Sequence, residues 1–213
     1  MIERYALVAA VGYLIGSIPF GLYAARYGLR NRPAGLGAAN IAPLDLYRRL
    51  GLGQKIAGVA FALELFKGFL PTFTGYLALG TPGAVGAGSA ALVGHHFPLF
   101  ARWHGSNTLA PLLGILLAIY PLVVVILGMV WTATLAAWRY ASLAALVTAV
   151  VSPLALAALD AGEAYENLVV LAAVLWSLLI FFAHRENIRR LVSGREAKIN
   201  APIGEGDRRR RVR

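Results

Sequence analysis

Long apolar runs separated by short charged segments constrain this chain more than any other feature. A helix needs about 20 mostly apolar residues to cross the hydrocarbon core of a bilayer. Only 14% of the 213 residues are charged and 59% are apolar, whereas a soluble domain has about 25% charged residues. We therefore expect an all-α fold, a polytopic membrane helical bundle. The apolar runs cover residues 2–27, 56–79, 84–100, 109–138, 141–159 and 168–183.

The composition excludes several classes of protein. The chain has no cysteine, which rules out disulfides, zinc ribbons and thiol nucleophiles. The net charge is +10, and in a soluble protein such a charge would suggest binding to nucleic acid. Here the basic residues lie between the apolar runs and in the tail, where we expect them to set the orientation of the chain in the membrane. We expect no nucleic-acid partner, one membrane domain over residues 1–198, and a disordered basic tail over residues 199–213. The tail is able to touch anionic lipid.

The distribution of charge predicts the topology. Basic residues concentrate in residues 25–55, in residues 101–108 and in the tail, while residues 160–166 hold three acids and no base. By the positive-inside rule, the C-terminus is cytoplasmic and the N-terminus external, which requires an odd number of crossings. We therefore expect residues 109–138 to break near Pro121 into two short helices, giving seven spans in the cell membrane. One long tilted helix is the alternative.

Two charged residues lie within the second apolar run. Glu64 and Lys67 are three residues apart, so they share a helix face and are able to pair. Charges inside a span are costly and usually face a cavity or a partner. The pair therefore suggests a functional or site-supporting role. The alternative is that Lys67 extends to the membrane interface and Glu64 merely neutralises it.

Polar residues also mark the ends of later runs. His95 and His96 are adjacent and point to different faces of a helix, so they form a poor metal pair, and we expect no metal. Residues 105–108 place glycine and small hydroxyls at a helix start, which suits an N-cap or an anion site. His184 and Asn187 share a helix face after the last run, where they either present polar groups to a pocket or belong to a basic anchor.

Taken together, these segments resemble the PlsY family of membrane glycerol-3-phosphate acyltransferases. The resemblance covers roughly residues 10–115 and 180–198, and its most specific part is the last segment. The matching segments are Gly16-Ser17-Ile18-Pro19-Phe20-Gly21 (family G-S-I-P-x-G), Asn40-Ile41 with Arg48 and Gly51, Glu64 to Pro71 (family D-x-x-K-G-x-x-P), Gly94-His95-His96-Phe97-Pro98 (family G-H-x-F-P), and His184 to Lys198 (family H-R-x-N-I-x-R-L-x-x-G-x-E-x-K).

The resemblance implies a seven-span fold with an active site on the cytoplasmic side, no metal and no cofactor. It implies transfer of a fatty acyl group from acyl-phosphate to the 1-hydroxyl of glycerol 3-phosphate, a step of phospholipid synthesis that gives lysophosphatidate. The donor is already activated, so the family has no classical base, and polar and basic groups hold both phosphates. The implied catalytic residues are Lys67, His184 and Asn187, and the implied substrate-binding residues are Asn40, Arg48 and His95. We add Arg102, Ser106 and Asn107 as candidate substrate-binding residues, because they lie in or beside the loop that stands in place of the family's phosphate-binding segment.

The chain departs from the family pattern in two loops. The family's G-S-G becomes Gly37-Ala38-Ala39, and its G-G-K-G becomes Gly105-Ser106-Asn107-Thr108. Asn107 thus stands where the family has a phosphate-binding Lys, and the loss of such a contact costs about 1.5–3 kcal/mol. Arg102 and His104 are the nearby residues able to replace this charge. An active acyltransferase is the main expectation. The alternative is a diverged paralogue without that activity, which binds a lipid or a membrane partner.

Overall fold

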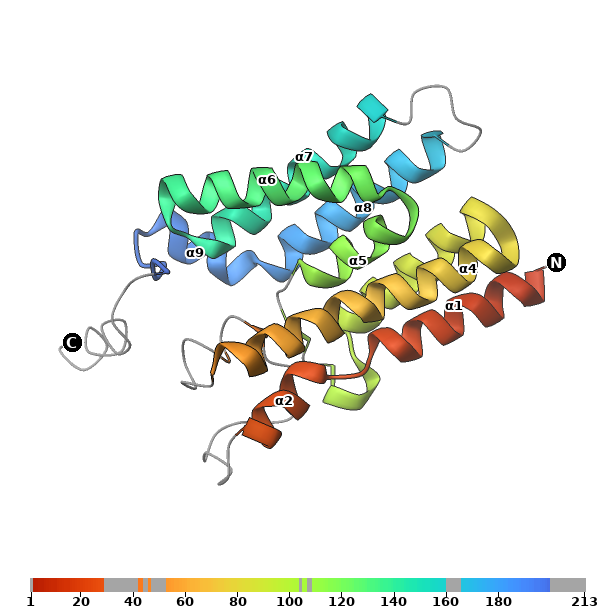
Figure 1. Cartoon of the computed structure of the whole chain (residues 1–213), viewed down its shortest axis with the longest axis horizontal. Helices are drawn as coiled ribbons and strands as arrows, with labels where there is room; N and C mark the ends of the chain where they lie inside the picture. The colour runs from red at the N-terminus through yellow and green to blue at the C-terminus, as the bar shows by residue number, and fades with distance from the viewer. Residues whose placement is uncertain are drawn as a thin grey trace.

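The computed structural model describes residues 2–28, 42–43, 46, 53–103, 105–106, 109–159 and 166–199. Within these residues the chain forms helices and no strand, and the long helices lie side by side in one bundle (Figure 1). The all-α fold expected from the sequence is confirmed. In chain order the helices are α1 (Ile2–Gly16), α2 (Phe20–Gly28), α4 (Gln54–His96), the 3-10 helix η1 (Leu99–Ala101), α5 (Ala110–Ile119), α6 (Pro121–Trp138), α7 (Ala141–Leu159), α8 (Glu166–Ala183) and α9 (Arg185–Val192).

Helix α4 consists of two limbs that run in opposite directions, joined at the yellow bend in Figure 1. The backbone leaves helical geometry at Gly80, with φ 67° and ψ −158°, a conformation that favours glycine. Gly75 and Gly83 then lie so close that a Cβ on either would overlap the carbonyl group of the other. The bend lies between the apolar runs over residues 56–79 and 84–100. It brings the charged residues of the first limb beside the histidines of the second.

Helix α1 packs along the second limb of α4. Gly12 and Gly16 are buried in this contact, and a Cβ at Gly16 would overlap the carbonyl oxygen of Ala91. Small residues four apart let two helix backbones approach closely in a membrane. Helix α1 ends at Gly16 and α2 begins at Phe20, so the first run is broken beside Pro19.

The break expected near Pro121 is confirmed. Helix α5 ends at Ile119 and α6 begins at Pro121, and between them Tyr120 has a non-helical φ of −134° and ψ of 73°. Proline suits the first position of a helix because its missing N–H would have no partner there. The alternative of one long tilted helix over residues 109–138 is therefore wrong.

Several of the described helices are long and apolar enough to cross a membrane. Four meet this condition, or five if the bent pair α8 and α9 counts as one span. With the limbs of α4 taken separately and the short α5 included, the apolar segments number about seven. They are α1 with α2, the two limbs of α4, α5, α6, α7 and α8.

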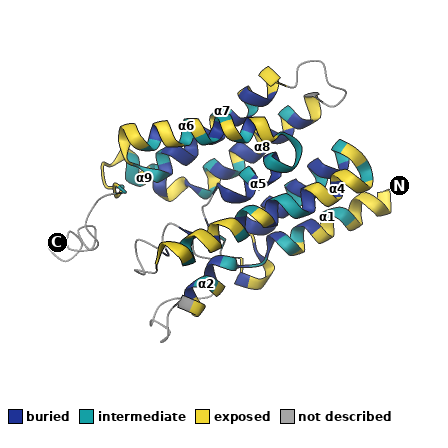
Figure 2. Ribbon diagram, in the orientation of Figure 1, coloured by how far each residue is buried: buried dark blue, intermediate teal, exposed yellow. Residues whose placement is uncertain are grey.

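The largest apolar cluster lies where α4, α5, α6, α7 and α8 meet. Leu92, Ile115, Leu127, Leu156 and Ile180 are each 0% exposed there. Large apolar side chains also cover the outer faces of the helices, which Figure 2 shows in yellow. An apolar outer face is the expected surface for helices surrounded by lipid. Of the polar residues that the sequence singles out, His95 and His184 lie at the ends of α4 and α8, and Glu64 and Lys67 lie within the first limb of α4.

Candidate functional site

Glu64 and Lys67 form a buried ion pair in the first limb of α4. Lys67 Nζ lies 2.7 Å from Glu64 Oε2, and the side chains are 1% and 0% exposed. Lys67 Nζ also donates a hydrogen bond to the carbonyl oxygen of Ile18 over 3.0 Å, in the link between α1 and α2. Its burial contradicts the alternative in which Lys67 extends to the membrane interface. The pair instead ties α4 to the break in the first apolar run.

The second limb of α4 brings His95 to this pair. His95 Nδ1 lies 3.1 Å from Glu64 Oε2, and its other ring nitrogen, Nε2, lies 3.2 Å from Ser106 Oγ. The contact of Nδ1 with the carboxylate lacks hydrogen-bond geometry, and the tautomer of His95 decides which of Nε2 and Oγ is the donor between them. The structure thus joins the predicted site residues Lys67, His95 and Ser106 through Glu64.

The loop that carries Ser106 lies directly on the end of α4. A Cβ at Gly105 would overlap the carbonyl oxygens of His95 and His96, so glycine is needed for this approach. The cap residue of α5 is Leu109, and α5 has no side-chain cap. The N-cap interpretation is therefore wrong for Ser106, whose hydroxyl bonds to His95 instead.

His96 is a buried polar residue that the sequence did not single out as a site residue. Its ring meets that of His95 edge to face, with centroids 4.8 Å apart. Its Nε2 is buried and has no hydrogen-bond partner within the described part of the chain. His96 occupies the variable position of the G-H-x-F-P segment, so no sequence signal marks it.

His184 lies at the sharp turn between α8 and α9, whose axes differ by 63°. The side chain is buried, and Nδ1 lies 2.9 Å from the carbonyl oxygen of Ile180. A carbonyl only accepts hydrogen bonds, so Nδ1 carries the hydrogen and Nε2 keeps its lone pair. The rings of Phe97 and Phe182 meet at 6.3 Å, which places the ends of α4 and α8 together. His184 and His95 therefore lie at the same end of the bundle.

Asn187, in the first turn of α9, belongs to a second network centred on Glu196. Glu196 Oε1 accepts hydrogen bonds from Asn187 Nδ2 over 2.9 Å and from the Ser142 hydroxyl over 2.6 Å. Glu196 Oε2 accepts one from Arg190 Nε over 2.6 Å. Burial alone would raise the pKa of Glu196, but the hydrogen bonds from Ser142, Asn187 and Arg190 outweigh it and hold this pKa below its usual value. The ionised carboxylate thus fixes the Asn187 amide.

Sequence reasoning missed Ser142, because it lies in an apolar run without any motif. Arg102 is exposed, in the loop between η1 and Ser106, with a left-handed φ of 49°. Its role as a substrate-binding residue stays a prediction. Asn40, Arg48, His104, Asn107 and residues 200–213 lie outside the described residues.

Two further features of the described residues concern ligands. No three or more His, Asp or Glu side chains gather there in a way that could hold a metal ion.

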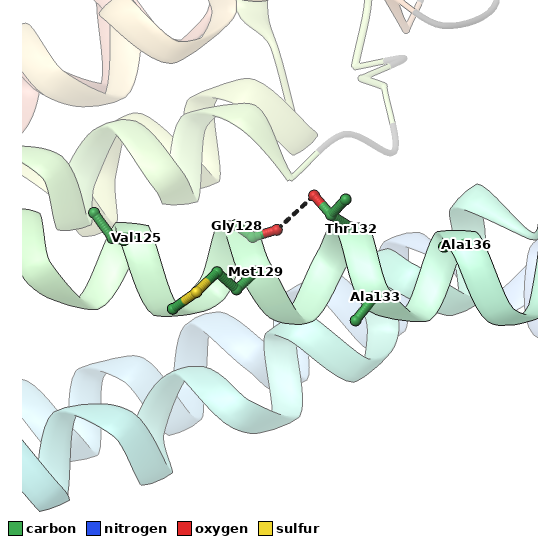
Figure 3. Close-up of a pocket in the computed structure, with 6 residues that line it drawn as sticks. All are labelled: Val125, Gly128, Met129, Thr132, Ala133 and Ala136. Carbon is green, nitrogen blue, oxygen red and sulfur yellow. Dashed lines mark hydrogen bonds between the residues drawn. The ribbon is translucent and has the colours of Figure 1, made fainter.

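A hollow of about 590 Å³ on the surface of α6 contains none of the predicted site residues. The hydroxyl of Thr132, which lines it, donates a hydrogen bond to the carbonyl oxygen of Gly128 (Figure 3). The hollow is lined by Val125, Gly128, Met129, Thr132, Ala133 and Ala136.

The chain matches known proteins over most of its length. The family model described as glycerol-3-phosphate acyltransferase matches residues 6–194. The glycerol-3-phosphate acyltransferase of Bradyrhizobium diazoefficiens is 37% identical over 201 residues, which cover 93% of this chain and 97% of that protein. Crystal structures of PlsY (YgiH), an integral membrane glycerol 3-phosphate acyltransferase, match as well. The lysophosphatidic acid form has a TM-score of 0.79 at 30% identity, covering 92% of this chain and 95% of that one. The glycerol 3-phosphate form has a TM-score of 0.77 at 31% identity, with the same coverage.

The Glu196 network yields a stability prediction. Glu196→Ala removes the carboxylate that accepts hydrogen bonds from Asn187, Ser142 and Arg190, so we expect it to lower the free energy of unfolding by about 1–3 kcal/mol. Because folding lowers the pKa of Glu196, its contribution is present above the unfolded value near 4.5 and is lost as pH falls through the folded value. In detergent, the melting temperature of the native chain should therefore exceed that of the variant at neutral pH. This difference in melting temperature should shrink as the pH is lowered.

The matched control is Glu186→Ala, which removes the exposed ion pair between Glu186 and Arg189 on the same short helix. Exposed pairs contribute little to stability, so its melting curve should follow that of the native chain. Equal melting temperatures for the native chain and Glu196→Ala at neutral pH would contradict the role given to this network.

Proposed function

The chain belongs to the glycerol-3-phosphate acyltransferase family, and we propose that the polar cluster around Lys67, His95 and His184 is its acyl-transfer site. It is an integral membrane enzyme that acylates glycerol 3-phosphate in phospholipid synthesis. The inactive-paralogue alternative is not favoured, because the family match spans residues 6–194. The observation that carries the site is the buried contact network of Glu64, Lys67 and His95, since ionisable groups at membrane depth usually mark function.

Acyl-phosphate is the proposed acyl donor. Its carbonyl carbon already carries a good leaving group, so the enzyme has mainly to position the donor and stabilise charge. An ammonium group has three hydrogens, and Glu64 and Ile18 take two of those on Lys67. We assign the third to an oxygen of the substrate. On the family resemblance, Asn40, Arg48 and His95 are proposed to hold the phosphates. Arg102, Ser106 and Asn107 are proposed to replace the family's phosphate-binding loop beside them.

The acceptor hydroxyl is proposed to meet His184. With hydrogen held on Nδ1 by the Ile180 carbonyl, Nε2 is the atom that accepts a hydrogen bond from the 1-hydroxyl of glycerol 3-phosphate. This bond turns an oxygen lone pair toward the acyl carbon and increases its nucleophilicity. Asn187, fixed by Glu196, is proposed to bind the acceptor beside it.

The proposed orientation places the N-terminus outside and the C-terminus in the cytoplasm. It rests on the basic segments 25–55 and 101–108 and the acidic segment 160–166. We propose that residues 1–198 form the acyltransferase domain and that the basic residues 199–213 meet anionic headgroups at the cytoplasmic face. A topology reporter fused at Gly162 should report an external location. A cytoplasmic signal would reverse the orientation.

The proposed site is tested by the rate of acyl transfer from palmitoyl-phosphate to labelled glycerol 3-phosphate by the purified chain. The native chain should form lysophosphatidate. His184→Ala should lower kcat by about 10²–10⁴-fold, the usual contribution of a group that handles the reacting proton. Glu186→Ala, which removes an exposed side chain at a variable position of the same segment, is the control and should keep the native rate. A native rate for His184→Ala would remove His184 from the site.

A further inference from the structure

One ring nitrogen, Nε2 of His96, is buried at the end of α4 with its hydrogen-bonding capacity unused. His96 is the last residue of α4, and its side chain is 7% exposed. None of the described residues forms a hydrogen bond with this nitrogen. A buried polar atom without a partner costs stability, so its presence in a folded protein requires an explanation. His96 thus presents a polar atom that the fold itself does not use.

His96 is next to both groups of the proposed site. Its ring meets that of His95 edge to face, with the centroids 4.8 Å apart. His184 and Lys67 are near enough to act on the ring electrostatically, and the backbone of Ser106 contacts it. His96 therefore borders the cluster around Lys67, the loop before α5 and the turn that carries His184.

The side chains around His96 are mostly basic. His95, His184 and Lys67 all act on its ring, while the carboxylate of Glu64 is already engaged by Lys67 Nζ at 2.7 Å. Basic groups gathered at one water-poor position attract an anion. A hydrogen bond from an imidazole N–H to a phosphate oxygen is charge-assisted and stronger than one between neutral groups. An anionic oxygen is therefore the partner that suits Nε2.

The local fold does not account for an imidazole at this position. Helix α4 ends through a backbone contact, in which the Phe97 N–H donates to the Val93 carbonyl. The close approach of the loop before α5 involves the carbonyl oxygens of His95 and His96, which a Cβ at Gly105 would overlap. An apolar side chain at residue 96 would fill the same space without burying an unpartnered nitrogen.

We propose that His96 is a substrate-binding residue whose Nε2 donates a hydrogen bond to a phosphate oxygen of the substrate. This inference rests on the proposed function and adds a residue to its binding site. An ionised phosphate group offers acceptors, so Nε2 carries hydrogen when the substrate is bound. The phosphate belongs to acyl-phosphate or to glycerol 3-phosphate, which present the same chemistry to the ring. No bond forms or breaks on His96, which holds the phosphate beside Lys67 and His184.

The test uses variants that separate the two ring nitrogens of His96. The amide of a glutamine reaches about as far as Nε2, whereas that of an asparagine reaches about as far as Nδ1. The native full-length chain, His96→Gln, His96→Asn and His96→Leu are compared for KM and kcat, with palmitoyl-phosphate and glycerol 3-phosphate each varied in turn.

The inference predicts a change in KM without a matching change in kcat. Loss of a charge-assisted hydrogen bond weakens binding by about 10–100-fold. We therefore expect His96→Asn and His96→Leu to raise the KM of one substrate by about this factor, because the lost contact contributes to binding throughout the reaction. His96→Gln should keep a KM close to the native value. The substrate whose KM rises is the one whose phosphate meets His96.

Melting temperatures give a readout that does not depend on turnover. Glycerol 3-phosphate or inorganic phosphate, compared with chloride at equal ionic strength, should raise the melting temperature of the native chain more than that of His96→Leu. Without ligand, His96→Leu should melt at the native temperature or above it, because it removes an unpartnered buried nitrogen. The matched control is Val93→Ala, which changes a 41% exposed side chain in the last turn of α4 and should keep the native KM values and the native shift.

The outcomes separate this inference from the proposed function. If the native chain forms lysophosphatidate and His96→Asn and His96→Leu keep both native KM values, the inference is overturned and the acyltransferase function stands. Equal KM increases in His96→Gln and His96→Leu, or a fall in kcat at native KM, also overturn it. If the native chain forms no lysophosphatidate, the proposed function fails, and the phosphate-induced melting shift decides the inference. A shift that His96→Leu loses supports the phosphate contact, and equal shifts, or none, overturn it.

Discussion

One carboxylate oxygen, Oε2 of Glu64, is the contact on which the arrangement of this end of the bundle depends. Lys67 Nζ and His95 Nδ1 meet it at 2.7 and 3.1 Å, from the two limbs of α4. An uncompensated charge in a low-dielectric interior is strongly destabilising. Lys67 compensates the charge of Glu64 from the same limb, and the bend of α4 at Gly80 returns His95 to its other side. Lys67 also donates a hydrogen bond to the carbonyl oxygen of Ile18, in the link between α1 and α2.

The C-terminal segment provides the second constraint. After α9 the chain crosses the turn between α6 and α7, where the Ile199 N–H donates to the Arg139 carbonyl over 2.8 Å. Lys198 Nζ lies 5.6 Å from the Tyr140 ring, and Glu196 joins α7 to α9 through Ser142 and Asn187. These contacts fix the short helix after His184. The late apolar helices thus support the groups at this end of the bundle.

Local rules predicted those features of the fold and site that depend on neighbouring residues. The pairing of Glu64 with Lys67 follows from helical spacing, and the break before α6 follows from Pro121. The resemblance placed His184 and Asn187 among the site residues, and the structure shows that they lie on separate networks. Contacts between distant segments could not be read in this way. Ser142 is one hydroxyl in an apolar run, and its contact with Glu196 spans 54 residues. The N-cap expectation failed for Ser106 because its loop folds back on α4.

The buried charges of α4 set the positions of Lys67 and His95 for acyl transfer, and the stability of the fold does not require them to be charged. The most direct measurement compares the native chain with the Glu64→Leu, Lys67→Met double variant for melting temperature and for lysophosphatidate formation from palmitoyl-phosphate. Replacing a buried ion pair by apolar residues of similar volume is often neutral or stabilising. We predict native-like melting with at least about 100-fold slower transfer. A double variant that transfers acyl groups at the native rate, or one that fails to fold, would contradict the claim.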